Sequence, residues 1–200
     1  MGPGGRILKP AEAFAELLEI LDKMEIPYAV SGSVASSVHG IPRTTMDVDL
    51  VADIHPDQVK DFAALLHPRF YADALAIADS LNRGRSFNVI HLASAYKFHI
   101  FPLRKDSYSQ ASFARRRFAE VRALSAEPLG CAIAAPEDTI LRKLEWYRAG
   151  GETSERQWSD LRGVMRVSGD TLDREYLRKW AQYLKVDDLL ERLLRERYEA

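Results

Sequence analysis

Two carboxylates stand two residues apart inside an apolar run, at Asp47 and Asp49. Successive side chains of a β-strand alternate between its faces, so a strand here would place both carboxylates on one face. Neighbouring carboxylates repel and raise each other's pKa unless a cation lies between them. Hard oxygen ligands of this kind select Mg²⁺ or Mn²⁺, so we expect Asp47 and Asp49 to bind that metal. The adjacent apolar residues are expected in the core: Val48, Leu50 and Val51.

A Gly-Ser pair lies upstream, between a short apolar strand at 28–30 and an expected helix at 34–39. Glycine lets the backbone approach a ligand closely, and a helix N-terminus with a serine hydroxyl can bind phosphate. We therefore expect Gly32 and Ser33 to contact the phosphates of a nucleotide. The other interpretation is a plain strand-to-helix turn with Ser33 as its N-cap, and both can hold at once. The Gly-Ser pair is also why we favour a metal site over two surface carboxylates on an edge strand.

Two further polar residues precede the carboxylates, Arg43 and Thr45. Both residues are candidates for nucleotide binding. For Arg43 the reason is that a guanidinium can neutralise phosphate charge with two hydrogen bonds. Loop arginines are common, and a purely structural Arg43 stays open as the alternative.

The Gly32-Ser33 pair followed by Asp47-x-Asp49 resembles the motif of the nucleotidyltransferase superfamily, which has the DNA polymerase β-like fold. Residues 135–151 and 154–158 resemble the C-terminal helices of small bacterial members related to abortive-infection and toxin–antitoxin nucleotidyltransferases. The resemblance implies an α/β mixed sheet with flanking helices. It also implies Mg²⁺-dependent transfer of a nucleotidyl group from an NTP to an RNA or protein acceptor, with a cognate toxin or antitoxin as a partner.

The superfamily usually carries a third acid on a neighbouring strand, and the matching strand here, 96–101, has His99 in that place. Alternation puts Phe98 and Ile100 on the core face and His99 on the other. An imidazole can accept a proton, but it brings no negative charge and binds Mg²⁺ poorly. Two hypotheses follow: His99 is a catalytic residue, or the chain is a degenerate nucleotidyltransferase that acts as a nucleotide-binding or antitoxin module. Nucleotidylation of a small molecule such as an antibiotic is a third.

The resemblance also implies that Lys143, on an expected helix at 136–148, reaches the triphosphate. The alternative is a solvated helix face shared with Arg142 and Glu145. On the next helix, Arg156 and Asp160 have the spacing of an i,i+4 ion pair, which we interpret as structural. The alternative is that both residues line the cleft.

Several other residues invite simpler interpretations. The run 115–117 of three arginines could grip RNA or a partner protein, although such runs are usually solvated. The three tryptophans stand at core-like helical positions: Trp146, Trp158 and Trp180.

Composition bounds the class of protein. The chain has 200 residues. Its formal net charge of -1 excludes a general polyanion-binding field, and its single cysteine excludes an internal disulfide. We see no signal peptide and no apolar run of membrane-spanning length, so we expect a cytoplasmic protein without membrane contact. We expect a flexible tail at 1–9, a nucleotidyltransferase domain at 10–135 and a helical region packed on it at 136–200.

Hydrophobic periodicity and turn residues predict the elements. Helices are expected from 10 until Pro27, and at 34–39, 56–66, 72–81, 109–117, 136–148, from 154, 173–184 and 187–198. Strands are expected at 28–30, 46–52, 87–92, 96–103, 120–124 and 131–134.

Overall fold

The computed structural model describes residues 10–45, 47–122 and 128–199, and their strands form one mixed sheet of seven strands. The tail expected at 1–9 lies outside the described residues. The strands run in the order β3-β4-β5-β2-β1-β7-β6. Their bounds are β1 (Tyr28–Ser31), β2 (Asp47–Ala52), β3 (Phe70–Tyr71), β4 (Phe87–His91), β5 (Lys97–Pro102), β6 (Arg117–Val121) and β7 (Leu129–Ile133).

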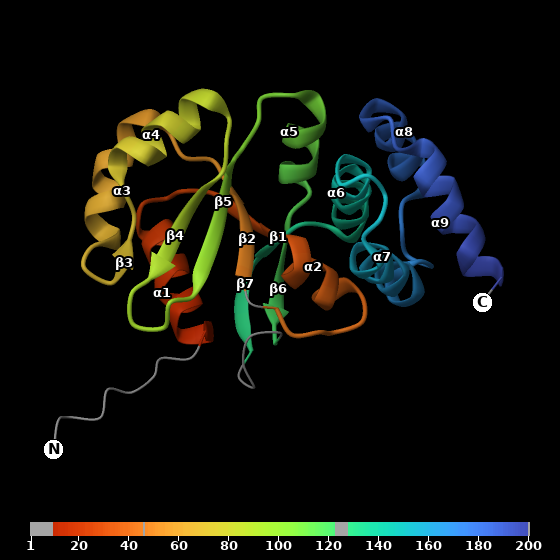
Figure 1. Ribbon diagram of the computed structural model, residues 1–200, viewed down its shortest axis with the longest axis horizontal. Coiled ribbons are helices and arrows are strands. Elements are labelled where there is room, and N and C mark those ends of the chain that lie inside the picture. Colours follow the sequence, from red (N-terminus) through yellow and green to blue (C-terminus); the bar gives the residue numbers. More distant parts are fainter. Residues whose placement is uncertain (1–9, 46, 123–127, 200) are drawn as a thin grey trace, which may run out of the picture.

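Helices cover the sheet and extend beyond one side of it (Figure 1). The bounds are α1 (Pro10–Lys23), α2 (Gly32–His39), a 3₁₀ turn η1 (Pro56–Gln58), α3 (Val59–Leu66), α4 (Ala74–Arg83), α5 (Ser107–Ala114), α6 (Pro136–Ala149), α7 (Glu155–Ser168), α8 (Arg174–Leu184) and α9 (Asp187–Glu199). The α/β class with a mixed sheet and flanking helices, expected from the sequence, is confirmed.

Three adjacent strands carry the residues that matter most. Strand β2 pairs antiparallel with β1 on one side and parallel with β5 on the other. Asp49 stands opposite Ser31 of β1 and opposite His99 of β5. This register brings the Gly-Ser turn, the two carboxylates and the histidine strand into one row across the sheet.

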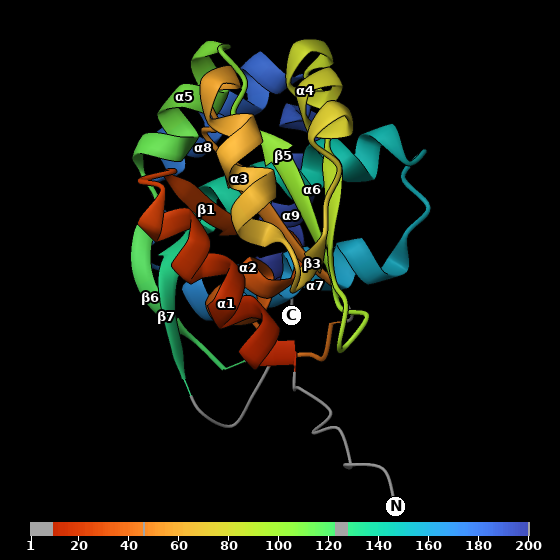
Figure 2. The same cartoon turned by 90° about the vertical axis from the view of Figure 1, so that its left-hand side faces the viewer.

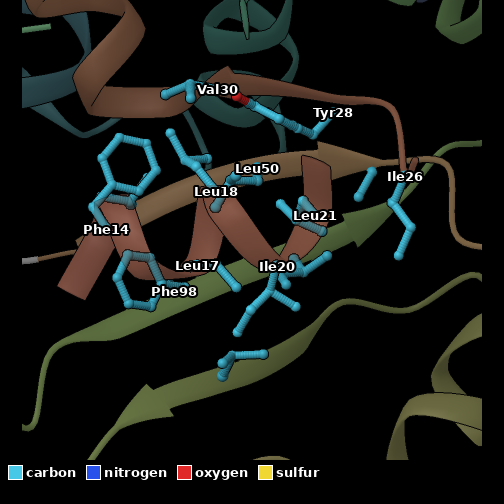
Figure 3. Packing of buried hydrophobic residues seen from close by; sticks show 14 of the residues in the cluster. Phe14, Leu17, Leu18, Ile20, Leu21, Ile26, Tyr28, Val30, Leu50 and Phe98 are labelled. Atoms are coloured by element: carbon cyan, nitrogen blue, oxygen red, sulfur yellow. The ribbon is translucent and has the colours of Figure 1, made fainter. Parts of the chain in front are cut away.

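One hydrophobic core lies between the sheet and the helices α1, α3 and α4 (Figure 2). The apolar positions of α1 recur near the helical period, and Phe14, Leu17 and Leu21 are fully buried. Figure 3 shows these side chains directed at the strands, where Phe14 packs against Phe98 with ring centroids 6.0 Å apart. This core fixes the far face of the sheet and leaves the other face to the polar residues.

A second core belongs to the helices α6 to α9, with Tyr108 of α5 fully buried in it. Figure 1 shows these helices gathered beside the sheet. Helix α2 packs against α6 and α7 and so joins the two cores. The boundary at residue 135 expected from the sequence stays a prediction, since α5 precedes it and yet packs into the helical core.

The long elements agree with expectation, and the differences concern short or edge segments. The helix expected at 56–66 begins as the 3₁₀ turn η1, because Pro56 fits a first turn. Strand β3 has two residues, too few to show a period, and was not expected. The helix expected at 109–117 is α5, which ends at Ala114, so Arg117 opens β6 instead. Met46 and residues 123–124, expected at strand ends, lie outside the described residues.

Among the described helices, none combines the length and the apolar character that crossing a bilayer requires.

Candidate active site

The two carboxylates occupy one face of β2, as alternation predicts. Asp47 and Asp49 line a cavity of about 600 Å³, while the alternating residues Val48 and Leu50 are fully buried on the opposite face. Val51 was expected in the core. It is only partly buried and lines the same cavity, because it shares the carboxylates' face.

Asp49 is the more deeply buried of the two acids. Burial raises the pKa of its carboxyl group, and the nearby charge of Asp47 raises it further. Its Oδ1 lies 3.4 Å from Nδ1 of His99, which opposes it across the β2–β5 pair. Gly32 has φ +59°, and a Cβ on it would collide with the Asp49 carboxylate. Only glycine therefore fits where the turn meets this acid.

These residues fit a divalent cation. Two carboxylates that face one cavity, one of them buried and destabilised in its charged form, are stabilised by a cation between them. Mg²⁺ usually binds one or two carboxylates and completes its shell with water and substrate phosphates, so two acids suffice. Among the described residues, no group of three or more acidic, histidine or cysteine side chains has the arrangement of a metal site.

The Gly-Ser turn opens α2 and faces the carboxylates across the cavity. Ser33 lies in the first turn of this eight-residue helix, and both Gly32 and Ser33 line the cavity. The expected N-cap role of Ser33 is wrong, since Ser31 holds that position and makes no side-chain cap bond. The Ser33 hydroxyl instead accepts a hydrogen bond of 2.6 Å from Arg43.

Arg43 and Lys143 meet at a single acid, Asp160 of α7. Nε of Arg43 donates to Asp160 at 2.8 Å, and Nζ of Lys143 donates to it at 2.7 Å. Burial alone would raise the pKa of Asp160, but hydrogen bonds from the two cations hold it below its usual value. Burial lowers the pKa of Lys143, and Asp160 partly offsets that effect. All three side chains line the cavity.

This cluster, Arg43–Lys143–Asp160, corrects two interpretations of the sequence. The expected i,i+4 pair of Arg156 with Asp160 is wrong, since Asp160 forms its ion pairs with Arg43 and Lys143. The solvated alternative for Lys143 is wrong as well, because the residue is buried. The alternative that Arg156 and Asp160 line the cleft is confirmed, since both line the cavity. Sequence reasoning missed the partner of Asp160, because Arg43 lies 117 positions away.

Thr45 lies behind Asp47 instead of in the cavity. Its hydroxyl donates to the Asp47 backbone carbonyl at 3.1 Å and approaches the carboxylate Oδ1 at 3.2 Å. Thr45 is buried and is not part of the cavity lining. This geometry orients the acid, and direct nucleotide contact by Thr45 stays a prediction.

His99 faces the cavity as expected, while its neighbours Phe98 and Ile100 are fully buried. Two residues further along the same face, Phe101 meets Trp146 of α6, with ring centroids 5.4 Å apart. Trp146 was expected in the core, and that expectation is wrong: it is 43% exposed and lines the cavity. The other two tryptophans, Trp158 and Trp180, are buried as expected.

The arginine run does not form a continuous basic surface. Arg115 pairs with Glu137 at 2.9 Å and stacks on Tyr176, with its guanidinium carbon 4.0 Å from the ring centroid. Arg116, which follows α5, stacks on Phe113 of that helix. Arg117 is exposed at the start of β6. A structural role therefore accounts for Arg115 and Arg116.

Solved structures place this fold among known ones, although no family model and no curated protein sequence matches the chain. An antigenic nucleotidyltransferase-like protein from Paracoccidioides brasiliensis superposes with a TM-score of 0.57 at 15% identity, over 96% of this chain and 91% of that one. The antibiotic-resistance factor ANT(2″)-Ia gives 0.52 at 12% identity, over 94% and 96%. A crystal structure of ANT(2″)-Ia in complex with adenylyl-2″-tobramycin gives 0.50 at 11%, over 86% and 94%. The resemblance to the nucleotidyltransferase superfamily is thus confirmed at the level of the fold.

Proposed function

We propose that this chain is a Mg²⁺-dependent nucleotidyltransferase, which moves a nucleotidyl group from an NTP to a hydroxyl of an acceptor. One observation carries the proposal: Asp47, Asp49, Ser33 and Lys143 line a single cavity although they come from three separate stretches of sequence. Two anionic groups beside a cationic group and a helix N-terminus suit a triphosphate that carries a metal.

Each residue has a task in this reaction. Asp47 and Asp49 hold the metal, which when bound neutralises phosphate charge and stabilises the leaving pyrophosphate. Ser33 and the α2 N-terminus donate hydrogen bonds to the outer phosphates, and Arg43 and Lys143 supply positive charge. The acceptor oxygen attacks the α-phosphorus as the bond to pyrophosphate breaks. His99 lies beside Asp49 and takes the acceptor proton.

The acceptor that we put first is an RNA or a protein, as the resemblance to toxin–antitoxin nucleotidyltransferases suggests. That resemblance also favours a cognate toxin or antitoxin as a partner and a cytoplasmic location. The fold likeness to ANT(2″)-Ia, a factor of antibiotic resistance, favours a small antibiotic acceptor as the second candidate.

A different function is favoured by His99 itself. With His99 in place of a third carboxylate opposite Asp49, the chain would bind nucleotide and metal without turnover, as a degenerate nucleotidyltransferase in an antitoxin or binding module. The observation behind it is the position of an imidazole opposite Asp49, where the resembling proteins have an acid.

Calorimetric titration with ATP, GTP, CTP and UTP, each with Mg²⁺ or Mn²⁺, tests the site. We expect metal-dependent NTP binding by the wild type and by Arg117→Ala, whose side chain lies outside the cavity. The double variant Asp47→Ala/Asp49→Ala should lose it. Equal binding by the double variant would exclude this site.

Incubation with each labelled NTP then tests the reaction. Label transferred to RNA, to protein or to an aminoglycoside identifies the acceptor class. Binding without transfer to any of them would favour the degenerate function instead.

A further inference from the structure

The cavity contains an aromatic pair that the phosphate and metal chemistry does not use. Phe101 of β5 and Trp146 of α6 line the cavity in mutual contact. Trp146 stays 43% exposed, although Lys143, Leu144 and Tyr147 on the same helix are buried. Large aromatic side chains left open in a concave site typically contact a ligand.

We propose that Phe101 and Trp146 form a stacking platform for the base of the nucleotide substrate. The inference rests on the proposed function and deepens it, because it names how the nucleoside end of the NTP is bound.

The register of β5 places the platform at a suitable distance from the carboxylates. His99 stands opposite Asp49, and Phe101 follows two residues later on the same face. A strand rises about 3.3 Å per residue, so Phe101 lies roughly 7 Å along the strand from the level of Asp49. This is the span of a ribose between a phosphate held at the carboxylates and a base stacked on Phe101.

The spacing of residues along α6 independently supports the same placement of the base. Trp146 follows Lys143 by three residues, so it lies on the same side of the helix about 4.5 Å further along its axis. Arg43 and Lys143 gather at Asp160, toward the α2 N-terminus. Phosphates bound by these cations would leave the nucleoside pointing along α6 toward Trp146.

The residues around the platform favour recognition of the face of a base over recognition of its edge. Val51, Pro102 and Leu103, which line the same end of the cavity, are apolar. Two charged side chains of α6 that line the cavity are paired with each other, since Arg142 donates to Glu145 at 2.7 Å. Stacking tolerates every base, so we expect modest preference among NTPs, with the larger purines bound more tightly.

Calorimetry with two probes tests the platform, ATP with Mg²⁺ and tripolyphosphate with Mg²⁺. Trp146→Leu keeps an apolar side chain but removes the ring, and should weaken ATP binding on the order of tenfold or more. Tripolyphosphate has no base, so its affinity should not change. Trp146→Phe should keep most of the ATP affinity. Tyr71→Leu, an exposed aromatic outside the cavity lining, is the matched control and should bind both probes as the wild type does.

Tryptophan fluorescence gives a second measurement that needs no destabilising variant. Since Trp158 and Trp180 are buried, quenching by ATP should come from Trp146. It should appear in the wild type and vanish in Trp146→Phe although ATP still binds.

Several outcomes would overturn the platform. Unchanged ATP binding by Trp146→Leu, while Asp47→Ala/Asp49→Ala loses it, would refute the platform and leave the proposed function intact. Equal loss of ATP and tripolyphosphate would mean a disturbed phosphate site. Weakened binding of a short RNA with normal ATP binding would assign the rings to the acceptor. A wild type that binds neither probe would refute both proposals.

Discussion

His99 decides how much chemistry this site can do. It opposes Asp49 in the sheet, and its Nδ1 lies 3.4 Å from that carboxylate. Its side chain is 29% exposed, so it remains open to the cavity and to a substrate. Because an imidazole adds no negative charge, Asp47 and Asp49 are the two anionic side chains that β2 and β5 present to the cavity among the described residues.

The first prediction restores the acid. His99→Asp adds a third anionic oxygen on the same face of β5, which should tighten Mg²⁺ binding. If the wild type is slow, the new carboxylate should also raise turnover about a hundredfold, the order that general-base help supplies. Turnover of labelled NTP with the identified acceptor, compared at saturating Mg²⁺, measures it. A fully active wild type and a slower His99→Asp would show that the histidine is itself the working base.

The position of a site residue could be predicted from the sequence where nearby residues in the chain determine it. Asp47 and Asp49 share a strand face because of alternation, and the Gly-Ser turn meets them because β1 pairs with β2. The partners of Asp160 were not predictable, since an i,i+4 spacing says nothing about a partner on another element. Trp146 was also misplaced, because helical periodicity does not separate a core position from one that faces a cavity.

At the scale of elements, the close approach of α2 to α7 positions Asp160 near the Gly-Ser turn. The backbone at Gly40, just after α2, lies against Val164 and Gly163 of α7, and a Cβ there would lie 2.6 Å from the Val164 nitrogen. The hydroxyl of Ser168 donates to the His39 carbonyl at 2.6 Å and fastens the same junction. The φ of Gly40 is −139°, outside the left-handed region, so it is the close contact with α7 that favours glycine at this position.

The second prediction concerns this junction. Gly40→Ala should lower the free energy of unfolding by about 2 kcal/mol, the usual order for an overpacked contact, because α7 must move away. It should also weaken NTP binding, since α7 carries Asp160. Urea unfolding and calorimetry measure the two effects.

Gly84→Ala is the control for Gly40→Ala. Gly84 has φ +61° but nothing within 4 Å of an added Cβ, so it carries backbone strain alone, about 1 kcal/mol, and should bind NTP normally. A stable Gly40→Ala with unchanged binding would show that α2 and α7 do not need this close contact.

The elements themselves were predictable in proportion to their length. The helices α1, α6 and α8 have several turns of apolar periodicity, and their expected bounds agree with the structure to within a few residues. Strand β3 forms by pairing with β4, and this contact between residues far apart in the sequence cannot be read from local periodicity. The start of β6 at Arg117 likewise depends on pairing with Ile133 of β7.

At the scale of the whole molecule, the cavity lies where the sheet meets the helical core, and Asp160 links the two across it. Arg43 comes from the loop between α2 and β2, Lys143 from α6 and Asp160 from α7. The cluster combines two cations and one anion, and the side chain of Asp160 is only 8% exposed. Asp160 holds both cations in place by hydrogen bonds, at the positions where the proposed function would have them meet phosphates.

The third prediction sets stability against affinity in this cluster. Asp160→Asn removes the anion and leaves Arg43 and Lys143 unneutralised, which should cost about 3 kcal/mol of folding free energy at neutral pH. The same change should tighten binding of tripolyphosphate in the absence of metal, because both cations become available to it. Since the folded-state pKa of Asp160 is lowered, its stabilisation is fully present above the unfolded pKa and is lost as pH falls through the folded value.

The stability difference between Asp160→Asn and the wild type should therefore shrink as the pH falls below about 4, where unfolded aspartate becomes protonated. Urea unfolding at neutral and acidic pH, with tripolyphosphate titration, measures both effects. Asp188→Asn removes the same charge from an exposed pair with Arg148, so it should change neither quantity appreciably. If Asp160→Asn were as stable as Asp188→Asn, the cluster would contribute nothing measurable to holding the sheet and the helical core together. If it lost stability but bound tripolyphosphate no better, Arg43 and Lys143 would be structural and the phosphates would bind elsewhere in the cavity.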